Sequence, residues 1–234
     1  IAADKALGSA SKGLTIEAAA ASVAKALGFE GTNLMTFSAY ADQTGFTDAQ
    51  KETALQVQLS NNKIMTVVNS FAAAAEGSGM SEGAAFDLAI GSLVSVVETK
   101  VASGAALSFT DDLDEITAAV QADVKTYAAA NTEVIIDTDD FDTVATSAAA
   151  AVSNVVTKID TITLADIEAG TDNRADIFSV VSVLAEQVQT AAENIKDGTA
   201  TTVSIAMTDA AEVTAAVSNK APTSLALSKS TIAE

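Results

Sequence analysis

Large apolar residues recur along this chain at steps of three and four, and glycines or capping residues interrupt the runs at intervals. Steps of this size place side chains on one face of an α-helix. Thr47 followed by Gln50 is a capping-box signature, and apolar residues from Leu55 to Phe71 keep the helical spacing until Gly77 ends the run. The spacing therefore predicts one long central helix.

Shorter runs of the same kind predict further helices over 16–27, 82–103, 113–127, 144–159 and 177–195. For the helix after Ser81, we expect the large apolar side chains to form the buried face, namely Phe86, Ile90, Leu93, Val94 and Val97. A lysine stands in or near the last turn of four of these runs, where it meets the partial negative charge of the backbone carbonyls. The segment 131–140 breaks the pattern with β-branched residues, which indicates either a short strand or a packed connector.

The composition favours helices that pack closely. Hydrophobic residues make up 49% of the chain but aromatic residues only 4%, so alanine methyl groups supply much of the apolar surface. Runs such as residues 71–75 end in charged or glycine residues well before the roughly 20 apolar residues that a membrane-spanning helix needs. We expect a mostly α-helical, antiparallel bundle with ordered loops and no membrane insertion.

The charge and the missing residue types restrict function. The formal net charge is −19, which opposes binding to nucleic acid, and the chain contains neither Cys nor His. The commonest general base, the commonest transition-metal ligand and all thiol chemistry are therefore missing. No spacing supplies a base for a hydroxyl nucleophile, and the glycines form no phosphate-binding loop. We predict that the domain is not an enzyme and has no nucleic-acid partner.

The last stretch differs in composition from everything before it. After the only proline, Pro222, the residues Leu225, Leu227 and, beyond a polar gap, Ile232 alternate with small polar residues, which predicts a strand with one buried face. The sequence of residues 219–234 resembles the linker and first strand of the cadherin-like repeats of very large bacterial surface and adhesin proteins. It reads Asn-Lys-Ala-Pro-Thr-Ser-Leu-Ala-Leu-Ser-Lys-Ser-Thr-Ile-Ala-Glu. We therefore divide the chain into an α-helical domain at 1–198, a linker with a short helix at 199–221, and a terminal strand at 222–234.

The resemblance implies an extracellular place on a bacterial cell surface, with calcium as a junction ligand. In such modules the Glu that closes the first strand can bind calcium, and Glu234 occupies that position, although Asn219 and Lys220 depart from the acidic pattern of well-formed calcium junctions. A second string, residues 23–37, resembles an Ala-rich helical segment found beside cadherin-like repeats in marine bacterial surface proteins. Because the chain starts at Ile1, we expect it to be a processed or excised piece of a longer protein.

An acidic cluster at 137–142 raises the question of a second calcium site. Asp137 and Asp139 are oxygen ligands at alternate positions, which suits calcium. An EF-hand loop that began at Asp137 would, however, need a ligand where Phe141 stands and a Glu where Ala148 stands. The alternative interpretation is a solvated helix N-terminus, where Asp favours the helix dipole.

Three functions remain open from these observations. The first is a structural or adhesive module of an extracellular surface or matrix protein. In this role the segment 222–234 is either the first strand of a cadherin-like β-sandwich or a strand donated to a neighbouring copy or module, with Leu225, Leu227 and Ile232 as its apolar face. The second is a ligand-binding module that uses the loop at residues 29–46, where aromatic residues are denser than elsewhere. The third is an ice-interacting surface, suggested by the content of Ala and Thr.

Overall fold

The computed structural model describes residues 16–39, 45–170 and 174–219, and within these ranges it contains eight α-helices and one short 3-10 turn. They lie in the order α2(Ile16–Ala26), α3(Asp48–Gly77), α4(Glu82–Ser103), α5(Leu113–Ala130), α6(Thr138–Ile159), α7(Leu164–Glu168), α8(Arg174–Lys196), η1(Ala206–Thr208) and α9(Ala210–Asn219). Short loops join successive long helices. The chain therefore builds a helical bundle in which most contacts are made between helices.

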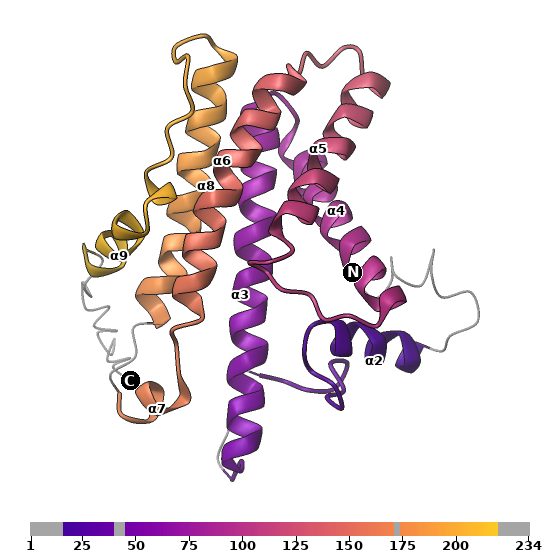
Figure 1. Ribbon diagram of the computed structural model, residues 1–234, viewed down its shortest axis with the longest axis vertical. Coiled ribbons are helices and arrows are strands. Elements are labelled where there is room, and N and C mark those ends of the chain that lie inside the picture. Colours follow the sequence, from indigo (N-terminus) through magenta and orange to yellow (C-terminus); the bar gives the residue numbers. More distant parts are fainter. Residues whose placement is uncertain (1–15, 40–44, 171–173, 220–234) are drawn as a thin grey trace, which may run out of the picture.

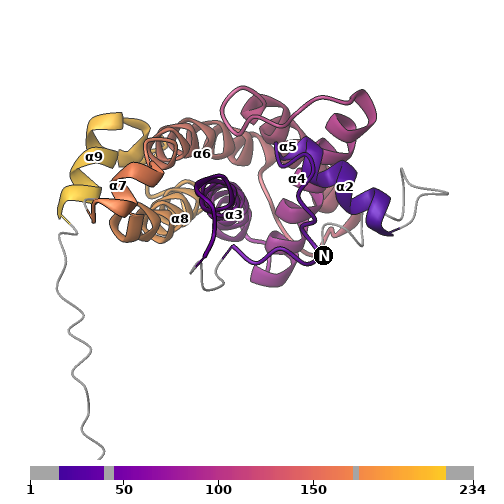
Figure 2. The same ribbon diagram turned by 90° about the horizontal axis from the view of Figure 1, so that it is seen from below.

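Helix α3 is the axis of the bundle. Its 30 residues run through the centre, with α6 and α8 on one side and α4 and α5 on the other, as Figures 1 and 2 show from two directions. In its second half, Phe71 and the four alanines that follow are all buried. A helix that is apolar all round is buried by neighbours on every side. Alanine side chains let α4, α6 and α8 approach this part of α3 closely.

The ends of the helices follow local sequence signals. The Thr47 hydroxyl accepts a hydrogen bond from the Gln50 amide N–H at 3.3 Å, and the Gln50 carbonyl Oε1 accepts one from the Thr47 amide N–H at 2.9 Å. This reciprocal pair is a capping box. Gly104, with φ of 69°, closes α4 in the left-handed conformation that glycine adopts without strain. The long central helix predicted from the spacing is confirmed as α3, which begins after Thr47 and ends at Gly77.

The buried face of α4 differs from the predicted one. Leu93 and Val94 are buried as expected, but Phe86 is 37% exposed, and Ile90 and Val97 are only partly buried. The side that faces the bundle instead carries small residues, among them Ala85, Ala89 and Ser92. Because apolar residues occur all round this helix, their spacing does not select one face, and the close approach to α3 selects the face with the smallest side chains.

The predicted fold class is wrong in its β component. The described ranges contain helices, turns and loops but no β-strand, so the bundle with an added strand is corrected to an all-helical fold. Residues 131–137 form a connector between α5 and α6, and 138–140 are already the first turn of α6; among the described residues no strand is present for this segment to pair with, so the strand alternative fails. The segment 222–234, where the terminal strand was predicted, lies outside the described residues.

Residues 199–219 pack back onto the bundle. Ile205, Met207, Val213 and Val217 are buried in the same hydrophobic core as the long helices. The Asn154 side-chain amide on α6 donates to the Met207 carbonyl at 3.1 Å and to the Thr208 carbonyl at 2.8 Å. The linker predicted at 199–221 contains the expected short helix, α9. Up to residue 219, however, this segment lies against α6 and α8 as a further layer (Figure 1).

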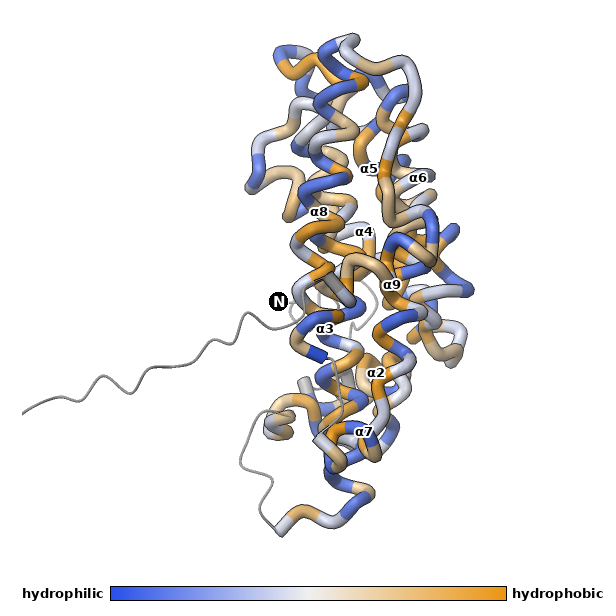
Figure 3. The backbone as a smooth tube through the Cα atoms, turned by 90° about the vertical axis from the view of Figure 1, so that its left-hand side faces the viewer, coloured by the Kyte–Doolittle hydropathy of each residue, from blue (hydrophilic) through white to orange (hydrophobic). Residues whose placement is uncertain are grey.

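Hydrophobic and hydrophilic residues alternate along the helices, as the banded colouring of Figure 3 shows, so the apolar residues are distributed over the whole bundle. Among the described residues, no helix is long and apolar enough to cross a membrane.

Candidate functional site

The loop after α2 is held against the bundle by a small second core. Ala24, Phe29, Ala39 and Val57 are buried together, so this core joins α2, the loop and α3. The Phe29 amide donates to the Ala24 carbonyl at 2.7 Å, and the Gln58 side-chain amide donates to the Ala39 carbonyl at 2.6 Å. The described part of the loop, residues 29–39, is therefore anchored at both ends, as expected for an ordered loop.

Within this loop, Asn33 organises a tight turn. Its side-chain Oδ1 accepts a hydrogen bond from the Met35 amide at 3.0 Å, and its backbone carbonyl accepts from the amides of Thr36 and Phe37 at 3.1 and 2.8 Å. Gly31 precedes the turn with φ of +87°, a value that favours glycine. The turn brings the Phe37 ring back against the small core, where it is half-buried.

A cavity of about 370 Å³ lies between this loop and the first turns of α3. We call it the loop cavity. Its seven lining residues carry no ionisable side chain: Gly31, Thr32, Asn33, Thr36 and Phe37 belong to the loop, and Gln50 and Thr53 belong to α3. A concave site with one aromatic wall and several convergent polar groups is a common form of ligand-binding site.

The aromatic density of residues 29–46 pointed to this loop, but only part of that segment forms the cavity. Phe29 is buried in the small core, and Met35 is 59% exposed. Residues 40–44, with Tyr40, lie outside the described ranges. Sequence reasoning missed the contribution of α3, since Gln50 was recognised only as a capping residue. Its position beside the loop depends on how α2 and α3 pack.

The acidic cluster begins α6 as an N-cap. Asp137 accepts hydrogen bonds through Oδ1 from the amides of Asp139 and Asp140 at 3.0 and 3.2 Å. This is the usual role of Asp before a helix, because the first amides have no partner within the helix. In the part of the chain that the structure describes, no group of three or more carboxylates is placed to hold a metal ion.

Four lysines tie the elements of the bundle together. Lys51 on α3 lies 2.8 Å from the Glu168 carboxylate on α7, and Lys125 on α5 lies 2.6 Å from the Asp142 carboxylate on α6. Lys63 on α3 pairs with Asp160 just after α6, and the Lys63 side chain is only 15% exposed. The fourth, Lys100, joins α4 to the start of α5.

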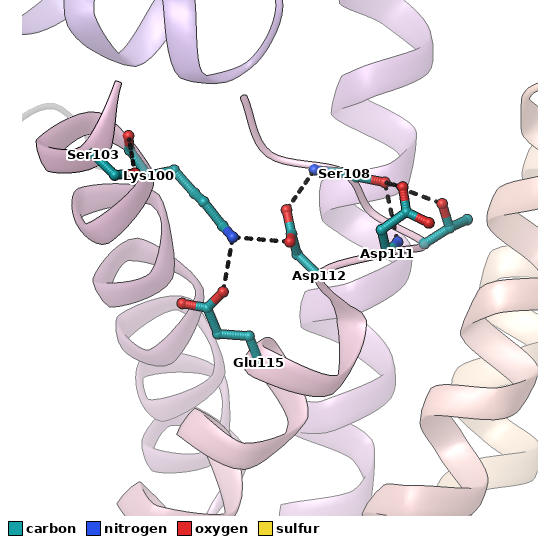
Figure 4. A network of polar contacts seen from close by, with 7 residues as sticks. Lys100, Ser103, Ser108, Asp111, Asp112 and Glu115 are labelled. Carbon is teal, nitrogen blue, oxygen red and sulfur yellow. Dashed lines mark hydrogen bonds and ion pairs between the residues drawn. The ribbon is translucent and has the colours of Figure 1, made fainter. Parts of the chain in front are cut away.

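The Lys100 network is the most enclosed of these contacts (Figure 4). The Lys100 ammonium lies 2.8 Å from the Asp112 carboxylate and 2.9 Å from the Glu115 carboxylate, and the side chains of Lys100 and Asp112 are 16% and 18% exposed. The second oxygen of Asp112 accepts from the Ser108 amide at 2.8 Å. The network thus joins the end of α4, the loop after it and the start of α5.

These contacts shift the pKa values of both partners. Burial of the Asp112 carboxyl favours its neutral form, but the hydrogen bonds from Lys100 and Ser108 outweigh this and lower the pKa of Asp112 below its usual 3.8. The hydrogen bonds to Asp112 and Glu115 raise the pKa of Lys100 above its usual 10.5. Both groups are charged at neutral pH, so the pair is structural and neither partner is poised for acid–base chemistry near pH 7.

A second concave surface, about 440 Å³ in volume, lies where α3, α4 and α8 meet. The exposed Phe86 ring stands at this groove beside Ala72 and Ala73, and Glu76 and Glu82 also line it. The groove follows from the rotation of α4, which leaves Phe86 outside the core.

The chain was compared with family models, curated proteins and solved structures, and none of them matches it. Its function has to be inferred from its own residues and their geometry. Of the residues 219–234 that carry the cadherin-like resemblance, Asn219 is the last residue of α9, and the others, including Glu234, Leu225, Leu227 and Ile232, lie outside the described ranges.

We expect the replacement Asp112→Asn to remove an acid-dependent contribution to stability. Because the pKa of Asp112 is lowered on folding, its contribution is present above pH 3.8 and is lost as the pH falls through the folded-state value. The Asn side chain still accepts from the Ser108 amide but carries no charge for Lys100. The urea midpoint of the variant should lie below that of the unsubstituted chain at neutral pH, and the two should converge in acid.

The matched control for this measurement is Asp111→Asn, one residue away, which leaves the ion pair between Lys100 and Asp112 intact. Its urea midpoint should fall on acidification as that of the unsubstituted chain does. An Asp112→Asn curve parallel to the unsubstituted one down to about pH 2 would contradict the role assigned to the pair.

We expect Asp137→Ala to lower the free energy of unfolding by about 1 kcal/mol through loss of the N-cap. Asp139→Ala should cost less, because Asp139 contributes only to the favourable charge of the first turn. Thermal unfolding measured with calcium and with magnesium distinguishes a role of Asp137 as N-cap from a role as metal ligand. If calcium raises the Tm of the unsubstituted chain and Asp137→Ala abolishes this rise, Asp137 is a ligand.

Proposed function

We propose that this chain is a structural and adhesive module of a bacterial extracellular surface or matrix protein. The observation that carries the proposal is that several of the few lysines form ion pairs between different elements of the bundle. Only 12 residues of the chain are basic, and Lys51, Lys63, Lys100 and Lys125 each join two different elements of the bundle. This use suits a load-carrying spacer, in which ion pairs and close alanine packing hold the helices together.

The remaining charge supports the same role. With 31 acidic residues and most inter-element pairs made by a few lysines, the exterior of the module is strongly acidic. Such a surface repels polyanions and attracts cations. An acidic module on the cell surface would avoid nucleic acid and would respond to divalent cations, which fits the calcium-dependent junction that the resemblance of residues 219–234 implies.

Self-assembly through Leu225, Leu227 and Ile232 is the second half of this proposal. Addition of a strand to a neighbouring copy would need an exposed sheet edge, and residues 16–39, 45–170 and 174–219 contain no sheet. We therefore assign these three apolar residues to contacts with a copy of the chain or with a neighbouring module, without a donated strand. Calcium bound at Glu234 would strengthen these contacts.

Sedimentation velocity on the full chain tests this role. The unsubstituted chain should associate in calcium and less in magnesium or in a chelator. A variant that carries Leu225→Ser, Leu227→Ser and Ile232→Ser should remain monomeric. The variant Glu234→Gln should associate to the same extent with and without calcium. If the unsubstituted chain is monomeric in all three conditions, or if the triple variant associates equally, self-assembly through these residues is wrong.

A second candidate function rests on the loop cavity. Residues 31–37 and the start of α3 line an open cavity of about 370 Å³ with free polar groups, although the surrounding bundle uses its polar side chains for caps and ion pairs. We propose that this cavity binds a small ligand, so that the module contributes to adhesion by recognition. The titrations described below test this role directly.

A further inference from the structure

We propose that the ligand of the loop cavity is a neutral saccharide. This inference rests on the ligand-binding role proposed for the cavity and adds the chemical class of the ligand. It follows from the free hydrogen-bonding groups of the cavity, from the lack of charge in its lining, and from the aromatic wall.

Two side-chain amides are held with their NH2 groups free. The Asn33 Oδ1 atom is occupied by the Met35 amide at 3.0 Å, and the Gln50 Oε1 atom is occupied by the Thr47 amide at 2.9 Å. Neither Asn33 Nδ2 nor Gln50 Nε2 donates to another group in the described ranges. Each NH2 group can donate two hydrogen bonds. Because the oxygens are already fixed, the donors are oriented before a ligand arrives, which reduces the entropy cost of binding.

Hydroxyl groups supply the complementary acceptors. Within the described part of the chain, the hydroxyls of Thr32 and Thr36 have no hydrogen-bond partner, so they can both donate and accept. The Thr53 hydroxyl donates to the Ala49 carbonyl at 2.9 Å and keeps its capacity to accept. A ligand that matches this mixture has several groups that both donate and accept, as sugar hydroxyls do.

The absence of charge in the lining selects a neutral ligand. All seven lining residues are uncharged, although the chain carries a net charge of −19. The acidic residues nearest in sequence have their own partners: Glu30 lies 3.7 Å from Lys25, Asp48 lies 3.4 Å from Lys51, and the Glu52 carboxylate accepts a hydrogen bond from the Gln56 side-chain amide at 2.8 Å. An ionic ligand would give up part of its hydration at the cavity without gaining a partner of opposite charge in the lining.

The Phe37 ring gives the cavity an apolar wall. It is packed against the small core of Ala24, Phe29, Ala39 and Val57, so its position is supported from behind. A ligand that covers this ring and also engages amides and hydroxyls needs an apolar face and a hydroxylated edge. A saccharide ring has both. An extended peptide would instead need a strand edge, which the described ranges do not contain.

The test is a titration of the full, isotope-labelled chain followed by proton–nitrogen correlation spectra. The probes are the methyl glycosides of glucose, galactose, mannose and N-acetylglucosamine, with glucuronate and ethanolamine as charged comparators. We expect at least one neutral glycoside to shift the backbone amide signals of residues 31–37 and 50–53. The affinity should be millimolar, because the cavity is open and offers few contacts.

The double variant Asn33→Asp and Gln50→Glu removes both NH2 donors and keeps both structural acceptors. The Asp carboxylate can still accept from the Met35 amide, and Glu is itself a preferred residue at this position of a capping box. The fold should therefore persist, and the affinity for the glycoside should fall at least tenfold. The matched control, Asn61→Asp, adds a carboxylate on an exposed part of α3 outside the cavity and should leave the affinity unchanged.

The other possible results of the titration contradict either the saccharide class or the ligand-binding role of the cavity. Equal binding of the glycoside by the double variant, or shifts confined to residues outside the cavity, would overturn the saccharide proposal. If glucuronate or ethanolamine shifts the amides of 31–37 and the neutral glycosides do not, the ligand class is wrong but the ligand-binding role stands. If no probe shifts them, both the class and the ligand-binding role are rejected.

Discussion

Replacement of Phe71 with alanine should lower the free energy of unfolding by about 3–5 kcal/mol, the largest effect we expect for a single substitution in this chain. Phe71 is 0% exposed and lies in the second half of α3, in the core shared with α4, α6 and α8. Its neighbours along α3 are four alanines, whose short side chains cannot move to fill the space left by the ring. The lost burial and the remaining cavity therefore add. Urea unfolding followed by circular dichroism measures the change.

The comparison that makes this result specific is Phe86→Ala. The same side chain is removed there from a position that is 37% exposed on α4. We expect a loss of about 1 kcal/mol or less, because no closed cavity forms. Phe71→Leu should be intermediate, since it retains much of the buried volume. Equal losses for Phe71→Ala and Phe86→Ala would show that α3 does not lie at the centre of the bundle.

Gly77→Ala should destabilise the bundle by about 2 kcal/mol although alanine is the better helix former. A Cβ atom at Gly77 would lie 2.5 Å from the Gln189 carbonyl oxygen and 2.7 Å from the Ala192 Cβ atom on α8. The first of these is a backbone atom, so the clash can be relieved only if α3 and α8 separate. Overpacking of this kind costs about 3 kcal/mol, and the gain in helix propensity returns about 1 kcal/mol.

Gly83→Ala is the matched control for this prediction. Gly83 also lies within a helix, but a Cβ atom there meets nothing within 4 Å. The same substitution should therefore stabilise the chain by about 0.5–1 kcal/mol. For a chain of this length, the two variants should differ in Tm by roughly 5–12 °C, in opposite directions from the unsubstituted chain. A Tm for Gly77→Ala at or above the unsubstituted value would mean that the α3–α8 contact is looser than described.

Several helix limits could be predicted, because they depend on residues only a few positions apart, although α6 begins at Thr138 and α8 at Arg174, before the predicted starts at 144 and 177. The capping box of Thr47 and Gln50 and the left-handed Gly104 are both visible in the sequence and present in the structure. The lysines in the last turns of α2, α4, α6 and α8 agree with the predicted ends as well.

The candidate site could be predicted only in part. The aromatic residues of the loop marked the segment at 29–46, and Phe37 indeed lines the loop cavity. Gln50 and Thr53 complete the cavity from α3, and no short-range signal connects them to Asn33. Their proximity results from the small core that holds the loop against α3 through Val57.

The sequence by itself determined the helical content, most of the helix ends and the acidic exterior of this protein, since each of these follows from composition or from residues within about one turn of each other. Only the tertiary structure decided that α4 turns its small residues inward, that residues 199–219 join the bundle, and that Lys51 pairs with Glu168, 117 positions away. The physical reason is that close packing depends on how well the whole faces of two helices fit together. The partners in such contacts are far apart along the chain, so their pairing cannot be read from local spacing.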